Sequence, residues 1–377
     1  MKDRVFDYKL SDSQATTLSP VSPADFDFAA FEDHEKQCLE TCAEFKNADQ
    51  GILVHRRMRV AGVFSEGCRD MRQSLELQLG GLAAGLDYRM DIPNFLEPWY
   101  GIGVTASSFG SKYFWEPKQA PAVSTEFDCT LDALAYADVP VRETPIGRHV
   151  LEMISYFLDA TDGRLPISLT DVQSPLNVAS GIIDINRFFM DMVTAPELVQ
   201  ELLMKIADRT VEFARDQLDI IGDNIVWPGH GFASCRTFEG IGASDDLILM
   251  LSNDMYRDLA CPSLNHQCAA LGGVAFHSCG DWSRAVSVVK DIRDIRVADG
   301  AFTKETDPDS NPPEMFSGEF ANTGITLNAR MVGGAETVCK AINAIWTPGT
   351  KMIAVTNCSS PDEHEQVYKY AKDLISG

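Results

Sequence analysis

The sequence predicts an α/β protein built as a single (β/α)8 TIM barrel with an N-terminal helical extension. Strand-like apolar runs alternate with helix-like segments seven or eight times along the chain, without an internal break in composition. Polar and thiol side chains follow several of these runs directly, and the carboxyl ends of its strands are where such a barrel places its chemistry. A doubly wound open sheet is the alternative, but no Gly-x-Gly-x-x-Gly follows the first expected strand.

Composition excludes several classes of function. The chain has 377 residues, of which 45% are apolar, and this is enough for a substantial core. Its 32 basic and 55 acidic residues give a net charge of −23, so neither nucleic acid nor a membrane surface is an expected partner. No run approaches the roughly 18 apolar residues of a membrane span, and the N-terminus lacks a signal-peptide core. Ten cysteines without such a signal favour reduced thiols and a cytoplasmic location.

Residues 1–50 are expected to form a partly helical extension, and residues 51–377 the barrel. Residues 1 to about 22 are polar and are typical of a surface extension. Ser22 as N-cap and Pro23 at the first helical position predict a helix that runs to Asn47. On that helix His34, Cys38 and Cys42 share one face, which favours packing of the two thiols over a metal site.

Short apolar runs predict the barrel strands and longer amphipathic runs the helices. Strands are expected near residues 88–92, 166–170, 224–227, 271–276, 295–298, 325–328 and 352–356. Helices are expected over residues 67–85, 144–160, 184–193, 196–222, 245–252, 254–271, 282–290, 312–322, 335–345 and 361–375. Pro196 and Gly222 mark the start and the end of the longest helix, as proline and glycine commonly do.

The segment from Pro93 to Val123 is long, turn-rich and aromatic. Long loops of this composition are seldom passive linkers. The segment either packs a small core of its own or forms a wall of the substrate pocket. In the second case Trp99, Tyr100, Phe109 and Trp115 are the side chains suited to stacking on a flat ligand.

Three residues have the chemistry of a catalytic metal site. His277 and Cys279 follow the strand expected at 271–276, and because alternate residues of an extended chain point the same way, both face one side. The strand at 352–356 leads to Cys358, so the three side chains can meet at the mouth of a barrel. One imidazole, two thiolates and an open position are the ligand set of a catalytic zinc. For the His-x-Cys pair alone, a half-buried histidine beside an inert thiol is the alternative.

Further polar residues fall at the expected carboxyl ends of strands, namely Asp91, Asp171, His230, Asp299 and Arg330. Asp171, Asp299 and His230 are the candidate catalytic residues. Asp299 is also favoured over Asp281 and Glu305 as a fourth zinc ligand or as a partner that orients a ligand. Each residue alone could be a loop residue or a helix cap, and their joint placement is what points to a site.

Several motifs resemble the uroporphyrinogen decarboxylase family over roughly residues 80–377. They are Asp171-Val172-Gln173-Ser174-Pro175, Pro196-Glu197-Leu198-Val199, Ser244-Asp245-Asp246, Leu251-Ser252-Asn253-Asp254-Met255-Tyr256 with Pro262, His277-Ser278-Cys279-Gly280 and Asn357-Cys358-Ser359-Ser360-Pro361. The resemblance implies a (β/α)8 barrel. One branch of the family decarboxylates uroporphyrinogen III without a metal. The other comprises corrinoid-dependent methyltransferases, such as the methylcobamide:coenzyme M enzymes, with His-x-Cys and a distant Cys as zinc ligands.

His277, Cys279 and Cys358 match the zinc pattern of the methyltransferase branch residue by residue. The decarboxylase motif Pro-Val-Trp-x-Met-Arg-Gln-Ala-Gly-Arg, in contrast, is expected to be missing. Its fragment Met71-Arg72-Gln73 occurs only in a helical context, and an acidic chain without the motif is an unsuitable host for a substrate with eight carboxylates.

The resemblance therefore implies a zinc-dependent methyltransferase. Such an enzyme moves a methyl group between a methylcorrinoid, carried by a corrinoid protein, and a thiol or similar small acceptor. Two alternatives stay open: a decarboxylase or other lyase that uses Asp91 or Asp171, and a non-catalytic corrinoid or small-molecule binder. The sequence also leaves open which acceptor is used and whether the protein is a homodimer.

Overall fold

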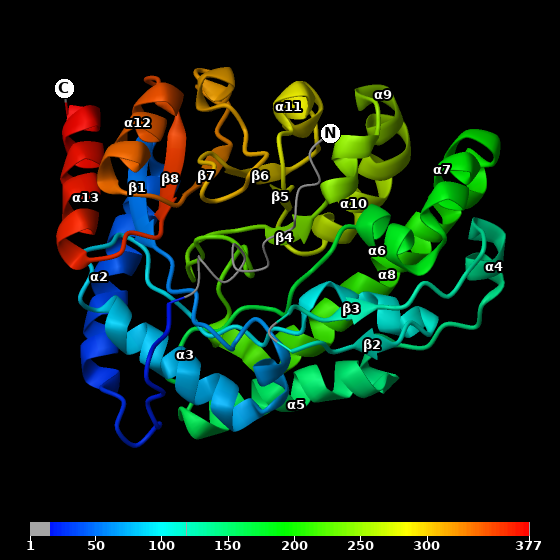
Figure 1. The fold of residues 1–377 in the computed structure, drawn as a ribbon, viewed down its shortest axis with the longest axis horizontal. Coiled ribbons are helices and arrows are strands. Elements are labelled where there is room, and N and C mark those ends of the chain that lie inside the picture. The colour runs from blue at the N-terminus through cyan, green and yellow to red at the C-terminus, as the bar shows by residue number, and fades with distance from the viewer. Residues whose placement is uncertain (1–15, 118, 377) are drawn as a thin grey trace.

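The centre of the molecule is a curved parallel sheet surrounded by helices (Figure 1). The computed structural model describes residues 16–117 and 119–376. Six strands are arranged in the order β1-β8-β7-β6-β5-β4, and every neighbouring pair is parallel. These strands are β1 (Gly51–Arg56), β4 (Ile241–Ser244), β5 (Val274–His277), β6 (Ile295–Ala301), β7 (Thr326–Met331) and β8 (Lys351–Thr356).

Short contacts between irregular segments close the remaining arc of the ring. The links run from Val54 to Asp91, from Leu96 to Ile167, from Ile167 to Ile225 and from Pro228 to Gly242. Each is a single bridge or backbone hydrogen bond rather than a ladder. The parallel α/β barrel that the sequence predicts is therefore confirmed, with one half built as a regular sheet and the other from bridged segments.

The positions of several strands differ from the predictions. Residues 88–92, 166–170 and 224–227 make isolated contacts instead of regular strands, and the first strand is β1, which was not predicted. The short strand β4 was also missed. β1 ends in His55 and Arg56, and β4 contains Gly242 and Ser244, so neither has the apolar run of a buried strand. Pairing with β8 and β5 overrides this weak local preference.

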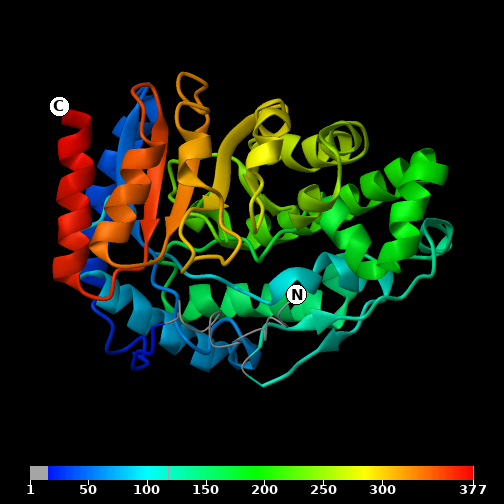
Figure 2. The ribbon, with the colours of Figure 1, turned by 45° about the horizontal axis from the view of Figure 1, so that its top comes forward.

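Helices cover the outside of the ring (Figures 1 and 2). They are α2 (Phe28–Asn47), α3 (Met71–Gly85), α4 (Thr130–Ala135), α5 (Pro145–Ala160), α6 (Pro175–Ile182), α7 (Ile185–Thr194), α8 (Pro196–Ile221), α9 (Asn253–Met255), α10 (Cys261–Ala269), α11 (Val286–Lys290), α12 (Ala335–Ile345) and α13 (Pro361–Ser376). A π-helical turn over residues 256–260 joins α9 to α10. The helices predicted over 245–252 and 312–322 are shorter 3-10 turns, Asp246–Met250 and Pro313–Phe316. Among the residues that the structure describes, no helix is both long and apolar enough to cross a membrane.

The extension supplies a helix that packs against the amino-terminal end of the barrel. This helix, α2, begins at Phe28 rather than at Pro23, because Asp27 caps it by accepting a hydrogen bond from the Ala30 backbone N–H at 3.0 Å. Its Cys42 thiol donates to the Asp91 carbonyl at 3.4 Å and is buried, as the packing interpretation expects. Residues 1–15 of the predicted surface extension lie outside the part of the chain that the structure describes.

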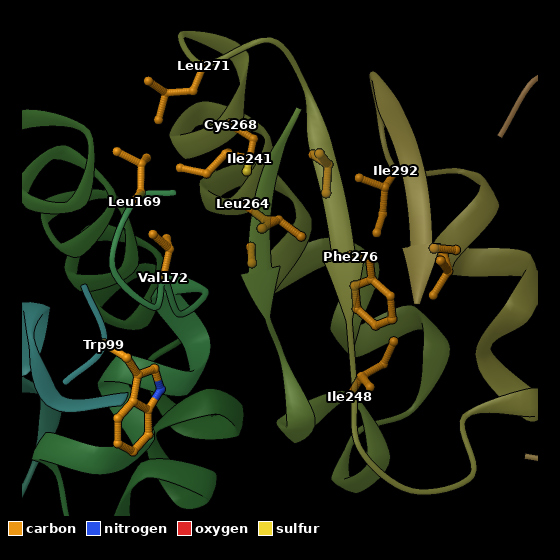
Figure 3. Close-up of a cluster of buried hydrophobic side chains, with 14 of the residues drawn as sticks. Trp99, Leu169, Val172, Ile241, Ile248, Leu264, Cys268, Leu271, Phe276 and Ile292 are labelled. Carbon is orange, nitrogen blue, oxygen red and sulfur yellow. The ribbon is translucent and has the colours of Figure 1, made fainter. Parts of the chain in front are cut away.

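Buried apolar side chains fill the space between strands and helices. Figure 3 shows Phe276 of β5 together with Ile248 and Ile292, and all three are buried. Such packing fixes the ends of β4 and β5, which carry the side chains described below.

Asp91 has a structural role and not the strand-end role considered above. Its carboxylate accepts hydrogen bonds from the Val54 backbone N–H at 2.7 Å and from the Tyr368 hydroxyl and Lys372 ammonium at 2.8 Å. It thus ties β1 to α13. Because these three donors of the protein itself occupy its carboxylate, Asp91 is not available to act on a substrate at the mouth.

The buried His364 predicts a loss of stability in mild acid. Its ring nitrogens contact Thr356 Oγ1 at 3.0 Å and the Arg89 carbonyl at 2.9 Å, and burial lowers the pKa of His364 to about 4. The ordinary histidine pKa of roughly 6.5 applies once the chain unfolds, so the unfolded state binds the proton more tightly. The contribution of neutral His364 to the free energy of unfolding is therefore fully present above about pH 6.5 and is lost as the pH falls toward about 4.

We expect the free energy of unfolding to fall by about 2 kcal/mol from this group between pH 7.5 and about pH 5. Chemical denaturation at the two pH values measures it. His364→Gln should make the fall smaller, while the equally buried His55, whose pKa burial lowers to about 3, continues to contribute. An unchanged pH dependence in His364→Gln would contradict the assignment.

Candidate metal centre

Asp246, His277 and Cys279 form a compact group of metal-ligand side chains. One ligand atom of each lies within 4.8 Å of the other two, and among the described residues this is the one group of its kind. His277 is the last residue of β5 and pairs in register with Ser244, the last residue of β4. Asp246 follows two residues later and accepts a hydrogen bond from the Cys279 backbone N–H at 2.7 Å. The pairing of two adjacent strands therefore brings the three side chains together.

The donor atoms fit zinc. A nitrogen at roughly 2.0–2.1 Å and a sulfur at roughly 2.3 Å from one tetrahedral zinc lie roughly 3.6 Å apart. The distance between His277 Nε2 and Cys279 Sγ is 3.5 Å. A thiolate among the donors favours zinc over magnesium or manganese, and three protein ligands leave one position for a small molecule.

Asp299 orients His277 from behind. Its Oδ2 lies 2.5 Å from His277 Nδ1, which leaves Nε2 pointing at Cys279. The same carboxylate accepts from Arg330 Nε at 2.9 and 3.2 Å and from the Asn328 amide. Asp299 is thus placed to orient His277, which fits one of the two roles predicted for it and resembles the usual arrangement behind metal-binding histidines.

Electrostatics keep the Asp299 side chain charged although it is buried. Burial alone raises the pKa of a carboxyl group, but Arg330 and His277 outweigh it and hold the pKa of Asp299 below its usual range. Burial alone would likewise lower the pKa of His277, yet Asp299 outweighs it and raises this pKa to about 10. A metal at Nε2 therefore has to replace a proton.

Cys358, the third predicted zinc ligand, does not join the group. Its thiol is buried, and burial followed by the neighbouring Glu363 raises the pKa of Cys358 to about 11. It stands two residues beyond β8, three strands away from β5, and its sulfur is not within 4.8 Å of both His277 and Cys279. Its surroundings are Glu363 of α13 and Cys339 of α12, so the thiol faces the helix layer.

A second polar group lies at the carboxyl ends of the bridged segments. His230 Nδ1 is 2.6 Å from Glu97 Oε2, and its Nε2 is 3.8 Å from Asp171 Oδ2. Gly229 and Gly231 on either side take positive φ angles of 109° and 86°, which allow the tight turn that presents the imidazole. The structure thus brings the two predicted residues His230 and Asp171 together, with Glu97 as a partner that was not predicted.

The pKa of Glu97 is lowered despite its burial. Desolvation acts to raise it, and the charges of His230, Arg57 and Arg59 outweigh that effect. The imidazole also packs against aromatic rings, with ring centroids 5.8 Å from Phe64 and 6.2 Å from Trp99. His230 is thus held between two carboxylates and two aromatic rings.

Arginines line a small cavity at the same end of the barrel. Arg57, Arg59 and Arg330 follow or end β1 and β7 and line a cavity of about 30 Å³. Arg57 Nη2 is buried without a hydrogen-bond partner among the described residues, and its nearest carboxylate oxygen, on Glu97, is 3.9 Å away. Since a buried N–H group without a hydrogen bond is costly, Nη2 is suited to donate to an anionic ligand, although the guanidinium already has Glu97 and the Phe64 ring beside it.

These arginines correct one expectation about the sequence. Met58-Arg59-Val60-Ala61-Gly62, directly after β1, matches Met-Arg-x-Ala-Gly of the decarboxylase motif that was expected to be missing. This fragment of the motif was visible in the sequence. Because β1 was not predicted, the fragment could not be placed at the end of a strand. Asp246 was likewise visible within the Ser244-Asp245-Asp246 motif, although nothing in the sequence indicated that it would meet His277.

The four predicted aromatic residues do not form one stacking surface. Phe109 is fully buried and offers no face to a ligand. Trp99 is buried beside His230, and its Nε1 has no hydrogen-bond partner among the described residues. Trp115 instead lines a separate groove beside α3 and α5, and Tyr100, which is as fully buried as Phe109, packs behind it in the same wall.

Fold and site together define a parallel α/β barrel whose strand ends carry a zinc-type ligand group and a histidine between carboxylates. The chain belongs to the uroporphyrinogen decarboxylase family: the family model described as "Uroporphyrinogen decarboxylase (URO-D)" matches residues 47–358.

Two solved structures are similar to this one. A methyltransferase from Methanosarcina mazei aligns with a TM-score of 0.60 and 14% identity, over 91% of this chain and 99% of that one. A protein from Listeria monocytogenes, described as a vitamin-B12-independent methionine synthase, aligns with a TM-score of 0.33 and 10% identity, over 67% and 73%. No curated protein sequence matches the chain significantly.

The geometry predicts which substitutions remove a bound metal. Cys279→Ala and Asp246→Ala should each reduce the zinc affinity of the purified protein by at least tenfold, because each deletes one of only three ligands. Zinc per chain, measured after dialysis against a weak chelator, tests this.

Cys358→Ala is the matched control and should retain zinc, since its thiol faces the helix layer. If Cys358→Ala loses zinc while Asp246→Ala keeps it, the loop after β8 must turn the Cys358 thiol into the mouth, and Asp246 is not a zinc ligand.

Proposed function

We propose that this protein is a zinc-dependent methyltransferase that moves a methyl group between a methylcorrinoid and a small thiol. The observation that carries the proposal is the group of Asp246, His277 and Cys279, with Asp299 behind the histidine. Fold similarity to a protein named as a methyltransferase supports it, as does the match of His277-Ser278-Cys279 to the zinc-binding branch of the family.

Zinc bound by these ligands would hold an acceptor thiol as its thiolate, and a thiolate is the nucleophilic form. In the transfer, a sulfur–carbon bond forms as the cobalt–carbon bond of the donor breaks, and the electron pair stays on cobalt. The corrinoid is a co-substrate in this proposal, carried by a partner protein. The cytoplasm is the location we propose, because both thiol ligand and thiol substrate need reducing conditions.

The arginines at the mouth suggest which thiols are accepted. Arg57, Arg59 and Arg330 line one cavity, and Arg330 also holds Asp299. We assign Arg57 Nη2, which makes no hydrogen bond among the described residues, to the anionic end of the acceptor, so that the other end, the thiol, is directed to Cys279 and His277. A carboxylate or sulfonate thiol is then a better substrate than a neutral one of equal length.

His230 is our candidate for the proton that the acceptor thiol loses. Glu97 Oε2 lies 2.6 Å from its Nδ1, and Asp171 Oδ2 lies 3.8 Å from its Nε2. We propose catalytic or supporting roles for His230, Asp171 and Asp299, as in the prediction from the sequence, and add Glu97 to them.

A matched pair of acceptors tests the proposal. With methylcobalamin as donor and zinc present, 3-mercaptopropionate should be methylated with a kcat/KM at least about tenfold above that of 1-propanethiol, because a charge-assisted hydrogen bond contributes roughly 1.5–3 kcal/mol. Arg57→Leu should remove this preference without lowering the rate with 1-propanethiol. Absence of methyl transfer to either thiol, also with added corrinoid proteins, would reject the proposed reaction.

His230→Ala separates proton transfer from metal binding. We expect kcat to fall by about 10²-fold or more, as for loss of a general base, while zinc content stays that of the parent protein. A raised pH in the assay should restore part of the rate, because the free thiol then ionises without help. Full activity of the variant at neutral pH would exclude His230 from the reaction.

A decarboxylase is the second candidate. It is favoured by Met58–Gly62, which retains part of the decarboxylase motif, and by the arginines in the cavity, since both suit a carboxylated substrate. This reaction needs no metal. Release of carbon dioxide from uroporphyrinogen III by zinc-free protein, unaffected by Cys279→Ala, would favour it over methyl transfer.

A further inference from the structure

A large groove lies beside the barrel mouth and shares no lining residue with the arginine cavity. It measures about 1210 Å³ and is open on one side. Its three walls are the start of α3, the aromatic segment and the start of α5, which pack side by side (Figure 1). Neither His230 nor any residue of the candidate metal centre takes part in these walls. The groove is thus a separate feature with its own chemistry.

Stacked and edge-on rings form one wall. Tyr113 stacks on Trp115 with ring centroids 5.8 Å apart and an angle of 22°, and the Arg69 guanidinium lies 5.3 Å from the Trp115 ring centroid. Tyr100 meets Trp115 edge-on at 6.3 Å and His149 at 5.1 Å. Because a guanidinium plane and aromatic faces both attract a further planar ring, this wall is suited to a flat ligand.

Hydrogen bonds hold these rings in place before any ligand arrives. The Tyr100 hydroxyl donates to the Cys68 carbonyl at 3.2 Å. His149 Nε2 lies 3.2 Å from the Arg69 carbonyl, which can only accept, so this nitrogen donates. The backbone of Arg69 is therefore fixed by α5, while its exposed guanidinium is free to adjust to a ring placed on it. A preformed wall reduces the entropy that a ligand loses on binding.

The Ser111 hydroxyl group indicates that the ligand carries a hydrogen-bonding group at its edge. Ser111 lines the groove and is 6% exposed, yet its Oγ has no hydrogen-bond partner among the described residues. A buried hydroxyl without a partner is unfavourable, and a ligand nitrogen or oxygen can satisfy it. Ser107 and Thr144, in contrast, already bond each other at 2.9 Å. The Tyr113 hydroxyl, on a residue that also lines the groove, likewise has no hydrogen-bond partner among the described residues, so at least two directional contacts are left for a ligand.

The charges in the walls select against anions. Glu66, Asp70 and Glu143 contribute three carboxylates, against the two cations Arg69 and Lys112. A phosphate or a polycarboxylate would therefore meet net negative charge, unlike in the arginine cavity.

We infer that this groove is a second binding site, which takes a neutral planar heteroaromatic group with a hydrogen-bonding edge. Its size leaves room for a substituent larger than the ring itself. The inference goes beyond the proposed methyl transfer and does not depend on it.

Titration calorimetry with adenosine, adenosine monophosphate and lumiflavin tests the inference. At least one of the two neutral compounds should bind with a Kd below about 1 mM, and adenosine should bind more tightly than its monophosphate. Trp115→Leu should weaken binding about tenfold or more, as loss of ring stacking does, and Ser111→Ala about threefold to tenfold. Unchanged thermal unfolding shows that both variants fold.

His277→Ala is the matched control and should leave these affinities unchanged, while Trp115→Leu should leave the zinc content unchanged. Failure of the metal proposal can therefore be distinguished from failure of this one. Absence of binding by both neutral compounds would overturn the inference. So would tighter binding of the monophosphate, or affinities that neither Trp115→Leu nor Ser111→Ala alters.

Discussion

The buried carboxylate of Asp299 is the interaction on which the candidate site depends. It sits in β6 and reaches His277 on β5 and Asn328 and Arg330 on β7, so one side chain joins three strands. A buried charge is costly without partners, and removal of one partner from such a network costs roughly 3–5 kcal/mol. The network fixes the ring of His277 and with it the position of Nε2 toward Cys279.

The two halves of the barrel support two kinds of chemistry. The regular sheet holds Asp246, His277 and Cys279 through the register of β4 and β5. The bridged half has few backbone hydrogen bonds between its segments, and loops enter the mouth there. His230 is presented by such a loop, between glycines that take positive φ. The candidate metal ligands therefore lie at the ends of regular strands, whereas His230 lies on irregular backbone.

The positions of the charged residues say as much about possible ligands as the net charge does. The net charge of −23 suggests a protein that avoids anions, yet three arginines gather around one cavity at the strand ends. Nearby carboxylates are already engaged, Asp299 with Arg330 and Glu97 with His230. The Arg57 Nη2 group is left without a hydrogen bond among the described residues. A small anion can therefore be attracted to the mouth of a strongly acidic protein.

The sequence by itself determined the barrel class, the ends of the longest helix and several of the residues with metal or proton chemistry. Periodicity and caps are local, so α8 starts at Pro196 as predicted. His277 and Cys279 are two residues apart on one chain segment, and their common direction follows from strand geometry alone.

Only the tertiary structure decided which of these residues meet. Asp246 joins His277 because β4 pairs with β5, and Cys358 does not join them because its thiol turns toward α12 and α13. Glu97 and His230 are 133 positions apart in sequence and meet only across the closed ring. Such contacts depend on register and side-chain direction, which the packing of the whole barrel fixes and no local pattern encodes.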